Sequence, residues 1–200
     1  MTLEINSALV KKLREKTGAG MMNCKKALQE TNGDFDEAIK TLRQKGLASA
    51  DKKVNRKVIE GLVNSYIHTG GKIGVLVEVN CETDFVARRE EFQELIKNIA
   101  MKIAASPEVI YIRTDDIPEE IFLAEKEIEL KKDDLNTKSD EMKNKIILGR
   151  VKKTLKSLSL IDQPFIRNPN ITIEELIKEK ISLFGENIRI KRFTRYTLGS

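Results

Sequence analysis

The run VNCETDFVAR, residues 79–88, decides how the chain is organised, because it joins a strand to a helix. The segment before it, Ile73 to Val79, places an apolar residue at every second position on one face and is the strongest strand candidate in the chain. The segment after it, from about Arg88 to Ala105, carries apolar residues at helical spacing and predicts a long amphipathic helix. Asp84 and Phe85 therefore lie where a sheet leads into a helix, a place where side chains can be held rigidly and still be exposed.

Two interpretations of Asp84 and Phe85 follow from this position. In the first, an aromatic side chain beside a carboxylate is a probe that enters a partner protein. In the second, Phe85 is the first apolar side chain of the helix stripe and Asp84 is the N-cap of that helix. Because helix start signals are common and probes are rare, the residues by themselves favour the second interpretation.

The first 47 residues predict a three-helix domain with a thin common core. Turns that contain glycine separate the helices, and polar residues at the helix starts can act as caps. In the third helix Asp34 and Glu37 have the spacing of a capping box. The predicted limits are Asn6 to Gly18, Met21 to Asn32, and Asp34 to Gly46.

Met21 and Met22 stand out in this domain, because a thin bundle cannot easily bury two adjacent side chains. Methionine is also the adaptable apolar side chain that is common at binding surfaces. Two alternatives stay open, namely a contact patch, or one core methionine beside an incidentally exposed one. The neighbouring Lys25 is interpreted as a solvent-facing charge.

Residues 48–57 are polar and basic and predict a linker, and residues 58–200 predict a core domain of antiparallel strands packed with helices. Because the strand candidates are few and partly non-consecutive, the expected fold class is α+β rather than a wound parallel sheet. Two charged helices either form a helical hairpin or pack over the sheet. The predicted strands are 62–68, 73–79 and 188–198, and the predicted helices are 88–105, 118–131, 139–159 and one from Thr172, with Asp133–Asn136 joining the two charged helices.

Composition and motifs limit the chemistry that the chain can perform. The formal net charge is +5, which favours an acidic partner or a phosphate backbone but also fits a solvated surface of mixed sign. Two distant cysteines and one histidine, His68, form neither a zinc set nor a disulfide framework. Phosphate-cradling glycine motifs and activated nucleophiles are missing, so the sequence predicts a non-enzyme with no catalytic residue, cofactor or metal. A signal peptide, a transit peptide and a membrane span are also missing, which predicts an intracellular protein.

The last predicted strand supports a rival hypothesis. Its cations alternate with aromatic residues, which is typical of an RNA-binding sheet surface. The same pattern also fits an edge strand that charge protects from aggregation. The residues concerned are Arg189, Lys191, Arg192, Phe193, Arg195 and Tyr196.

Two separate runs resemble signatures of bacterial and organellar elongation factor Ts, the guanine-nucleotide exchange factor for elongation factor Tu. They are KLREKTGAGMMNCKKAL at 12–28 and CETDFVAR at 81–88, and the resemblance extends over essentially the whole chain. One departure is Asn23, where the family usually has aspartate. The length resembles the short form of the family, which has a single core module and is found in bacteria and plastids.

The resemblance implies a fold and a set of partner contacts. Residues 1–47 are implied to form a ubiquitin-associated-like domain that touches the nucleotide-binding domain of elongation factor Tu. The run around Asp84 and Phe85 is implied to enter that same domain and to disturb its magnesium and phosphate site, while His68 is implied to contact the third domain. The implied contact residues are Met21, Met22, Lys25, His68, Thr83, Asp84, Phe85 and Val86.

A single core module also bears on the assembly. One protomer would struggle to supply both the Phe85 contact and the His68 contact, which leads us to expect a homodimer and a 2:2 complex. The resemblance further implies binding to the GDP-bound and nucleotide-free partner, in the bacterial cytoplasm or the plastid stroma. It implies no membrane and no direct nucleic-acid partner.

Overall fold

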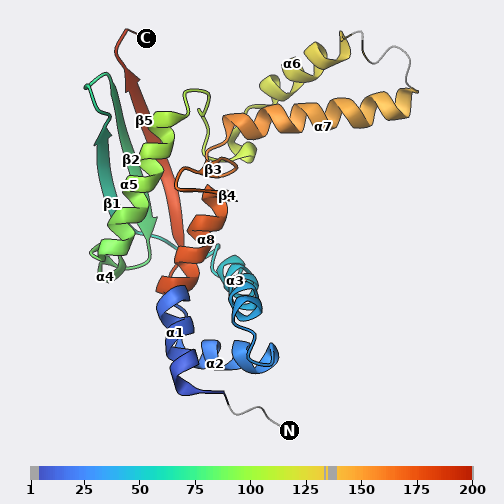
Figure 1. The fold of residues 1–200 in the computed structure, drawn as a ribbon. Coiled ribbons are helices and arrows are strands. Elements are labelled where there is room, and N and C mark those ends of the chain that lie inside the picture. Colours follow the sequence, from blue (N-terminus) through green and yellow to red (C-terminus); the bar gives the residue numbers. More distant parts are fainter. Residues whose placement is uncertain (1–4, 133, 135–138, 200) are drawn as a thin grey trace. The chain divides into compact units, whose positions relative to one another are not determined.

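The computed structural model describes residues 5–132, 134 and 139–199. Three helices open the described part of the chain, and short runs of strands and helices follow (Figure 1). The helices are α1 (Ser7–Thr17), α2 (Met21–Glu30), α3 (Phe35–Asp51), α4 (Asp84–Ala87), α5 (Glu90–Ala105), η1 (Thr114–Asp116), α6 (Glu119–Leu130), α7 (Asp140–Leu158) and α8 (Ile173–Phe184). The strands are β1 (Glu60–Ile67), β2 (Ile73–Cys81), β3 (Pro164–Phe165), β4 (Asn168–Thr172) and β5 (Ile188–Thr197).

The described residues fall into two compact units. Unit 1 comprises those within Met1–Leu62, Val79–Gln93 and Glu175–Lys191. Unit 2 comprises those within Val63–Glu78, Glu94–Glu174 and Arg192–Ser200. The boundaries of the predicted three-helix domain (1–47), linker (48–57) and core domain (58–200) stay a prediction.

In unit 1, helices α1, α2 and α3 surround a small apolar core, and their starts follow the predicted capping signals. The Asn6 side chain accepts a hydrogen bond from the Ala8 amide at 2.9 Å, and Asp34 accepts one from the Glu37 amide at 2.9 Å. Gly18 ends α1 in the left-handed conformation, with φ of 68°. The buried core residues are Val10, Leu13, Cys24, Ala27, Leu28, Ala38 and Leu42.

The helix end predicted at Gly46 is wrong, because α3 continues through Gly46 to Asp51. Packing explains this glycine better than helix termination does. A Cβ atom at Gly46 would lie 3.0 Å from the Ser182 hydroxyl of α8, which is tighter than ordinary contact. The missing side chain therefore lets α3 and α8 approach each other closely.

The main sheet has the strand order β1-β2-β5, and it confirms the predicted hairpin and the α+β class. The hairpin closes where the His68 amide donates to the Ile73 carbonyl at 2.9 Å. β5 runs antiparallel to β2, since the Leu198 amide donates to Lys72 while Arg192 pairs with Glu78 further along. The short strands β3 and β4 form a second, two-stranded sheet that the sequence did not predict.

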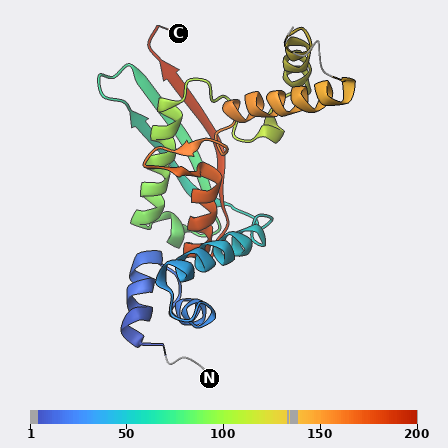
Figure 2. The same cartoon turned by 45° about the vertical axis from the view of Figure 1, so that its right-hand side comes forward.

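In unit 2, α5 lies along one face of the main sheet (Figure 1 and Figure 2). Buried side chains of β2 and α5 fill the space between them. The Arg195 guanidinium of β5 donates to the carbonyls of Ser106 at 2.6 Å and Ile103 at 3.3 Å, where it also offsets the negative end of the α5 dipole. The side chains exposed on the opposite face of the sheet include Val63, Ile67, Leu76 and Tyr196.

Helices α6 and α7 pack against each other, as one of the two predicted alternatives requires (Figure 1). Their contact buries Ile147 and Val151, with Phe122 packed against them. Arg150 donates to Glu129 at 3.2 Å and also binds Asp134, and this hydrogen bond lowers the pKa of the Asp134 carboxyl. The predicted connection Asp133–Asn136 lies outside the described residues except for Asp134. None of the helices in the described ranges is long and apolar enough to cross a membrane.

Gly61 gives a direct test of the contact between β1 and β2. Its φ is 145°, and a Cβ atom there would collide with the Val79 carbonyl oxygen and lie 2.6 Å from the Asn80 Cα. We expect Gly61→Ala to lower the free energy of unfolding by about 2–4 kcal/mol, as measured by urea denaturation. Gly70→Ala is the control, because Gly70 has a φ of 91° in open space and its loss should be about 1 kcal/mol. Equal losses at both positions would contradict the close approach.

Candidate partner-binding site

The turn between β2 and α4 presents one large aromatic side chain to solvent. Phe85 is 79% exposed, whereas Val86 is 6% exposed and Ala87 is also buried. The apolar stripe of α5 begins at the fully buried Phe92. The interpretation of Phe85 as the first apolar side chain of that stripe is therefore wrong.

Asp84 is not the N-cap of the long helix either. It is the first residue of the four-residue helix α4, and Thr83 occupies the N-cap position in an extended conformation. The Asp84 carboxylate pairs with Arg88 at 2.9 Å, one turn further along. Asp84 is half-buried, and Thr83 is half-buried as well.

A carboxylate from a distant part of the chain holds this turn. Glu186 lies between α8 and β5, and its Oε2 accepts hydrogen bonds from the amides of Glu82 at 3.2 Å and Thr83 at 3.0 Å. Its Oε1 accepts a third hydrogen bond from the Thr83 hydroxyl at 2.6 Å. The Thr83 hydroxyl is thus directed to Glu186 rather than to the start of α4, where no side-chain capping bond forms.

A second carboxylate connects the same segments in the opposite direction. The Asn187 amide donates to Glu82 Oε1 at 2.6 Å, and the Asn187 side chain donates to the carbonyls of Val54 at 3.1 Å and Arg56 at 2.8 Å. Arg56 also pairs with Glu82 at 3.6 Å. We call the set Glu82, Thr83, Glu186 and Asn187 the carboxylate clamp.

The two acidic residues close to Phe85 both have structural partners within the chain. Glu82 and Asp84 both have internal cationic neighbours, namely Arg56 and Arg88. Among residues 5–132, 134 and 139–199, no group of three or more His, Cys, Asp or Glu side chains is arranged to hold a metal ion.

At the start of α2, Met21 is 41% exposed and Met22 is 77% exposed. The core of the three-helix bundle is instead formed on this helix by Cys24, Ala27 and Leu28. The alternative that places one of the two methionines in the core is therefore wrong. Lys25, one turn further along the helix, is exposed as well.

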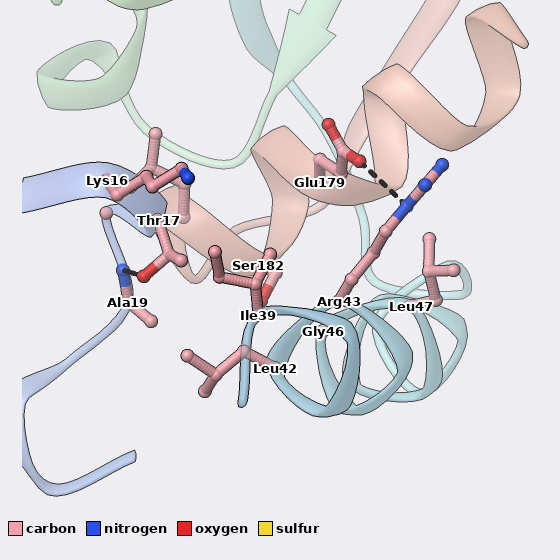
Figure 3. Close-up of a pocket in the computed structure, with 12 residues that line it drawn as sticks. Lys16, Thr17, Ala19, Ile39, Leu42, Arg43, Gly46, Leu47, Glu179 and Ser182 are labelled. Carbon is pink, nitrogen blue, oxygen red and sulfur yellow. Dashed lines mark hydrogen bonds and ion pairs between the residues drawn. The ribbon is translucent and has the colours of Figure 1, made fainter. Parts of the chain in front are cut away.

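Helix α8 joins the three-helix bundle to the rest of unit 1. Arg43 of α3 pairs with Glu179 of α8 at 3.2 Å (Figure 3). It also pairs with Glu175 of the same helix at 3.6 Å. Burial raises the pKa of the Glu179 carboxyl, an effect that the Arg43 charge opposes. A Cβ atom at Gly18 would lie 2.7 Å from Leu183, so this turn also sits close to α8.

A pocket of about 250 Å³ remains beside this contact. Its lining includes Lys16, Thr17, Arg43 and Glu179, together with apolar side chains of α3 and α8 (Figure 3). The ion pair of Arg43 and Glu179 already joins two of its charged groups. The pocket therefore lies at the packing interface between the three-helix bundle and α8.

His68 lies at the tip of the hairpin and is exposed. Its Nδ1 is 3.1 Å from the Tyr66 hydroxyl, and its carbonyl accepts a hydrogen bond from the Gly71 amide at 2.9 Å. His68 belongs to unit 2, whereas the other expected contact residues belong to unit 1. They are Met21, Met22, Lys25, Thr83, Asp84, Phe85 and Val86.

Of these seven residues, Met21, Met22, Lys25 and Phe85 present exposed side chains. Val86 is buried and supports the turn from beneath, so its side chain is not on the surface. The residue that the sequence reasoning missed is Glu186. The sequence marks Glu186 only as an acidic residue directly after Gly185, the glycine that ends a helix. This pattern is too common to identify a functional residue.

The basic strand β5 uses two of its cations inside the molecule. Arg192 pairs with Glu78 at 2.7 Å, and Arg195 holds the end of α5. Phe193 between them is partly buried. These contacts give both arginines a structural role within the chain.

Comparison with known proteins agrees with the resemblance of the two sequence runs, and it covers nearly the whole chain. The family described as Elongation factor TS matches residues 2–200. The chain is 64% identical over 199 residues to "Elongation factor Ts, chloroplastic" of Guillardia theta, which covers 100% of this chain and 91% of the relative. It is 63% identical to "Elongation factor Ts" of Rippkaea orientalis, over 98% of this chain and 79% of the relative. It is 60% identical to "Elongation factor Ts" of Synechococcus elongatus, over 98% of this chain and 89% of the relative.

The reactivity of Cys81 tests whether this thiol stays buried beside the Phe85 turn. Burial raises the pKa of its thiol to about 11, and the Glu186 carboxylate adds to the effect. Because the thiolate is the reactive form, we expect Cys81 to alkylate slowly at pH 8 and faster as the pH approaches that pKa. Mass spectrometry of iodoacetamide-treated protein measures this, with the urea-unfolded chain as the fast control. An alkylation rate of the native protein at pH 8 that equals the rate of the unfolded chain would contradict the burial of Cys81.

Proposed function

This chain belongs to the elongation factor Ts family, and we propose that it acts as a guanine-nucleotide exchange factor for elongation factor Tu. The observation that carries the proposal is the exposed Phe85 on a turn that the carboxylate clamp holds in place. A large aromatic side chain gains free energy when a partner covers it, so Phe85 has reason to enter a pocket of elongation factor Tu. As it enters, it shifts packed side chains and loosens the site that holds magnesium and the phosphates of GDP.

Exchange by this route requires no bond to be made or broken in the factor. This protein and GDP are two ligands of elongation factor Tu. Thermodynamic linkage requires that each lowers the affinity of elongation factor Tu for the other by the same ratio. GDP then leaves the ternary complex, GTP enters from the larger cellular pool, and the factor departs. The factor therefore works as a binding protein and not as an enzyme.

Met21 and Met22 form the second proposed contact with the nucleotide-binding domain, next to Lys25. Both side chains are unbranched and exposed, so they can adapt to the surface that they meet. Lys25 adds a positive charge that suits an acidic partner. Because the bundle is tied to α8 through Arg43, this contact and Phe85 are built on the same unit.

His68 forms the third proposed contact, with the third domain of elongation factor Tu. The hairpin tip exposes its imidazole, and Tyr66 lies 6.1 Å away between ring centroids. An aromatic pair of this kind can present a flat, partly polar surface to another protein. This contact is proposed for the partner in both its GDP-bound and its nucleotide-free state.

We further propose that two copies associate through the exposed face of the main sheet. Val63, Ile67 and Leu76 are exposed apolar side chains on that face, and Tyr196 on β5 extends it. A second copy would cover the same residues in both protomers, as a two-fold interface does. The dimer would then bind two molecules of the partner, in the bacterial cytoplasm or the plastid stroma. Similarity to a chloroplastic and to a bacterial relative supports these two locations.

Phe85→Ala tests the exchange mechanism. We expect the maximal stimulated release of a fluorescent GDP analogue from elongation factor Tu to fall about 10–30-fold, the loss typical of an interface hot spot. The circular dichroism spectrum and thermal midpoint should stay as in the wild type, because the removed ring is 79% exposed. Ile110→Ala removes another exposed apolar side chain and is the control. Stimulated release that is unchanged in Phe85→Ala would rule out the role of Phe85.

Leu76→Glu combined with Val63→Glu tests the dimer. Four new charges facing each other across the two-fold interface should separate the copies, since buried unpaired carboxylates are strongly unfavourable. Light scattering after size exclusion should change from twice the chain mass to one chain mass. Leu123→Glu, on an exposed position of α6, is the control and should remain dimeric. A wild-type chain that is monomeric throughout the accessible concentration range would contradict the proposal.

A further inference from the structure

We propose that Glu186 is a positioning residue for nucleotide exchange, and that it acts by fixing the turn from which Phe85 projects. The inference rests on the proposed exchange function. Glu186 lies 101 positions after Phe85 in the chain, yet its carboxylate accepts the hydrogen bonds of the two residues that precede Asp84.

The short helix that carries Phe85 cannot set its own orientation. α4 has four residues, which is too short for a helix to be stable without outside support. Thr83 at its N-cap gives it no side-chain hydrogen bond, because the hydroxyl is bound to Glu186. The direction of α4 therefore depends on what holds the residues before it and on the burial of Val86 and Ala87 after it.

The Glu186 carboxylate supplies the stronger part of this support. Two backbone amides and one hydroxyl converge on it, and hydrogen bonds to an ionised acceptor are stronger than neutral ones. Without the carboxylate, the half-buried amides of Glu82 and Thr83 would lose their acceptor, which is unfavourable. The turn would then rearrange or fluctuate to reach other acceptors, and Phe85 would move with it.

A loose turn should impair exchange more than it impairs the fold. Ordering a mobile segment on binding consumes part of the free energy of the contact, and the wedge action of Phe85 depends on that free energy. The apolar core of the three-helix bundle does not include Glu186. We therefore expect the maximal stimulated rate to fall, while the protein stays folded and still binds elongation factor Tu through its other contacts.

Two substitutions remove different parts of the clamp. Glu186→Gln keeps the size of the side chain but replaces one acceptor oxygen by an NH₂ donor, which cannot accept from the Thr83 hydroxyl or the amides. Thr83→Val keeps the shape of the side chain and removes only the hydroxyl donor, so it is the variant to use if Glu186→Gln does not fold. Glu179→Gln is the matched control, because Glu179 is a half-buried α8 carboxylate that forms an ion pair with Arg43 and, within the described part of the chain, no hydrogen bond to the Phe85 turn.

The first measurement does not involve elongation factor Tu. Hydrogen exchange followed by mass spectrometry should show the peptide that contains residues 82–87 exchanging at least about ten-fold faster in Glu186→Gln than in the wild type. Peptides from α1, α2 and α3 should be unchanged, and Glu179→Gln should leave residues 82–87 protected. If protection of this peptide is the same in Glu186→Gln as in the wild type, Glu186 does not hold the turn and the inference is wrong.

The second measurement is release of a fluorescent GDP analogue from elongation factor Tu over a range of factor concentrations. It is made for each variant and for the double variant that combines Glu186→Gln with Phe85→Ala. Glu186→Gln should lower the maximal rate about ten-fold and Thr83→Val about three-fold, with Glu179→Gln within about two-fold of the wild type. In the Phe85→Ala background, Glu186→Gln should add less than a two-fold loss, since residues that act through one another are not additive.

The outcomes separate the inference from the function beneath it. If the wild type stimulates release and Phe85→Ala impairs it, but Glu186→Gln does not, the exchange function stands and the positioning role falls. If Glu186→Gln causes the same loss with and without Phe85, it acts through the fold in general and the positioning role also falls. If the wild type does not stimulate release, the proposed function fails, and the inference fails with it.

Discussion

The hydrogen bonds that converge on the Glu186 carboxylate are the interaction on which the turn of unit 1 depends. An exposed aromatic side chain is unfavourable in water, and a flexible turn would fold Phe85 back onto the protein surface. Here the backbone before it is bound on both sides, to Glu186 and, through Glu82, to Asn187. The buried Val86 holds the turn from below. Phe85 therefore stays exposed because its own backbone has no freedom to bury it.

Helix α8 extends this constraint to the three-helix bundle. Its middle binds α3 through Arg43 and the close contact of Gly46 with Ser182, while the chain directly after it carries Glu186. At its end, Phe184 meets Phe92 edge-on at 6.3 Å and lies under the Arg89 guanidinium at 4.9 Å. The three-helix bundle is thus bound by α8, and the Phe85 turn is bound by the residues that directly follow α8. Two contacts made by a single rigid element can bind a partner with less loss of entropy than two independent ones.

The sequence predicted those parts of the fold that neighbouring residues determine. The Asp34 cap, the αL end at Gly18 and the hairpin all depend on local chemistry, and the structure has each of them. Gly46 was misread because a glycine that ends a helix and one that admits another helix look the same in a sequence. Phe85 was misread from its residues for a related reason, since local periodicity does not reveal which side of a short helix is supported. The Glu186 clamp joins residues 103 positions apart, and no local signal marks such a pair.

The two exposed apolar features of unit 1 suit different tasks because their side chains differ in stiffness. In the proposed mechanism, a phenylalanine ring on a fixed turn transmits force to the side chains that it displaces, since it cannot yield itself. Methionine has three rotatable side-chain bonds and accommodates the surface that it meets, so Met22 suits adhesion more than displacement. Linkage requires that whatever displaces GDP is displaced by GDP in return. An exchange factor must dissociate after each exchange. A rigid wedge suits this requirement, because it binds the nucleotide-free state of the partner more tightly than the other states. A wide adhesive surface would bind all states of the partner with similar affinity.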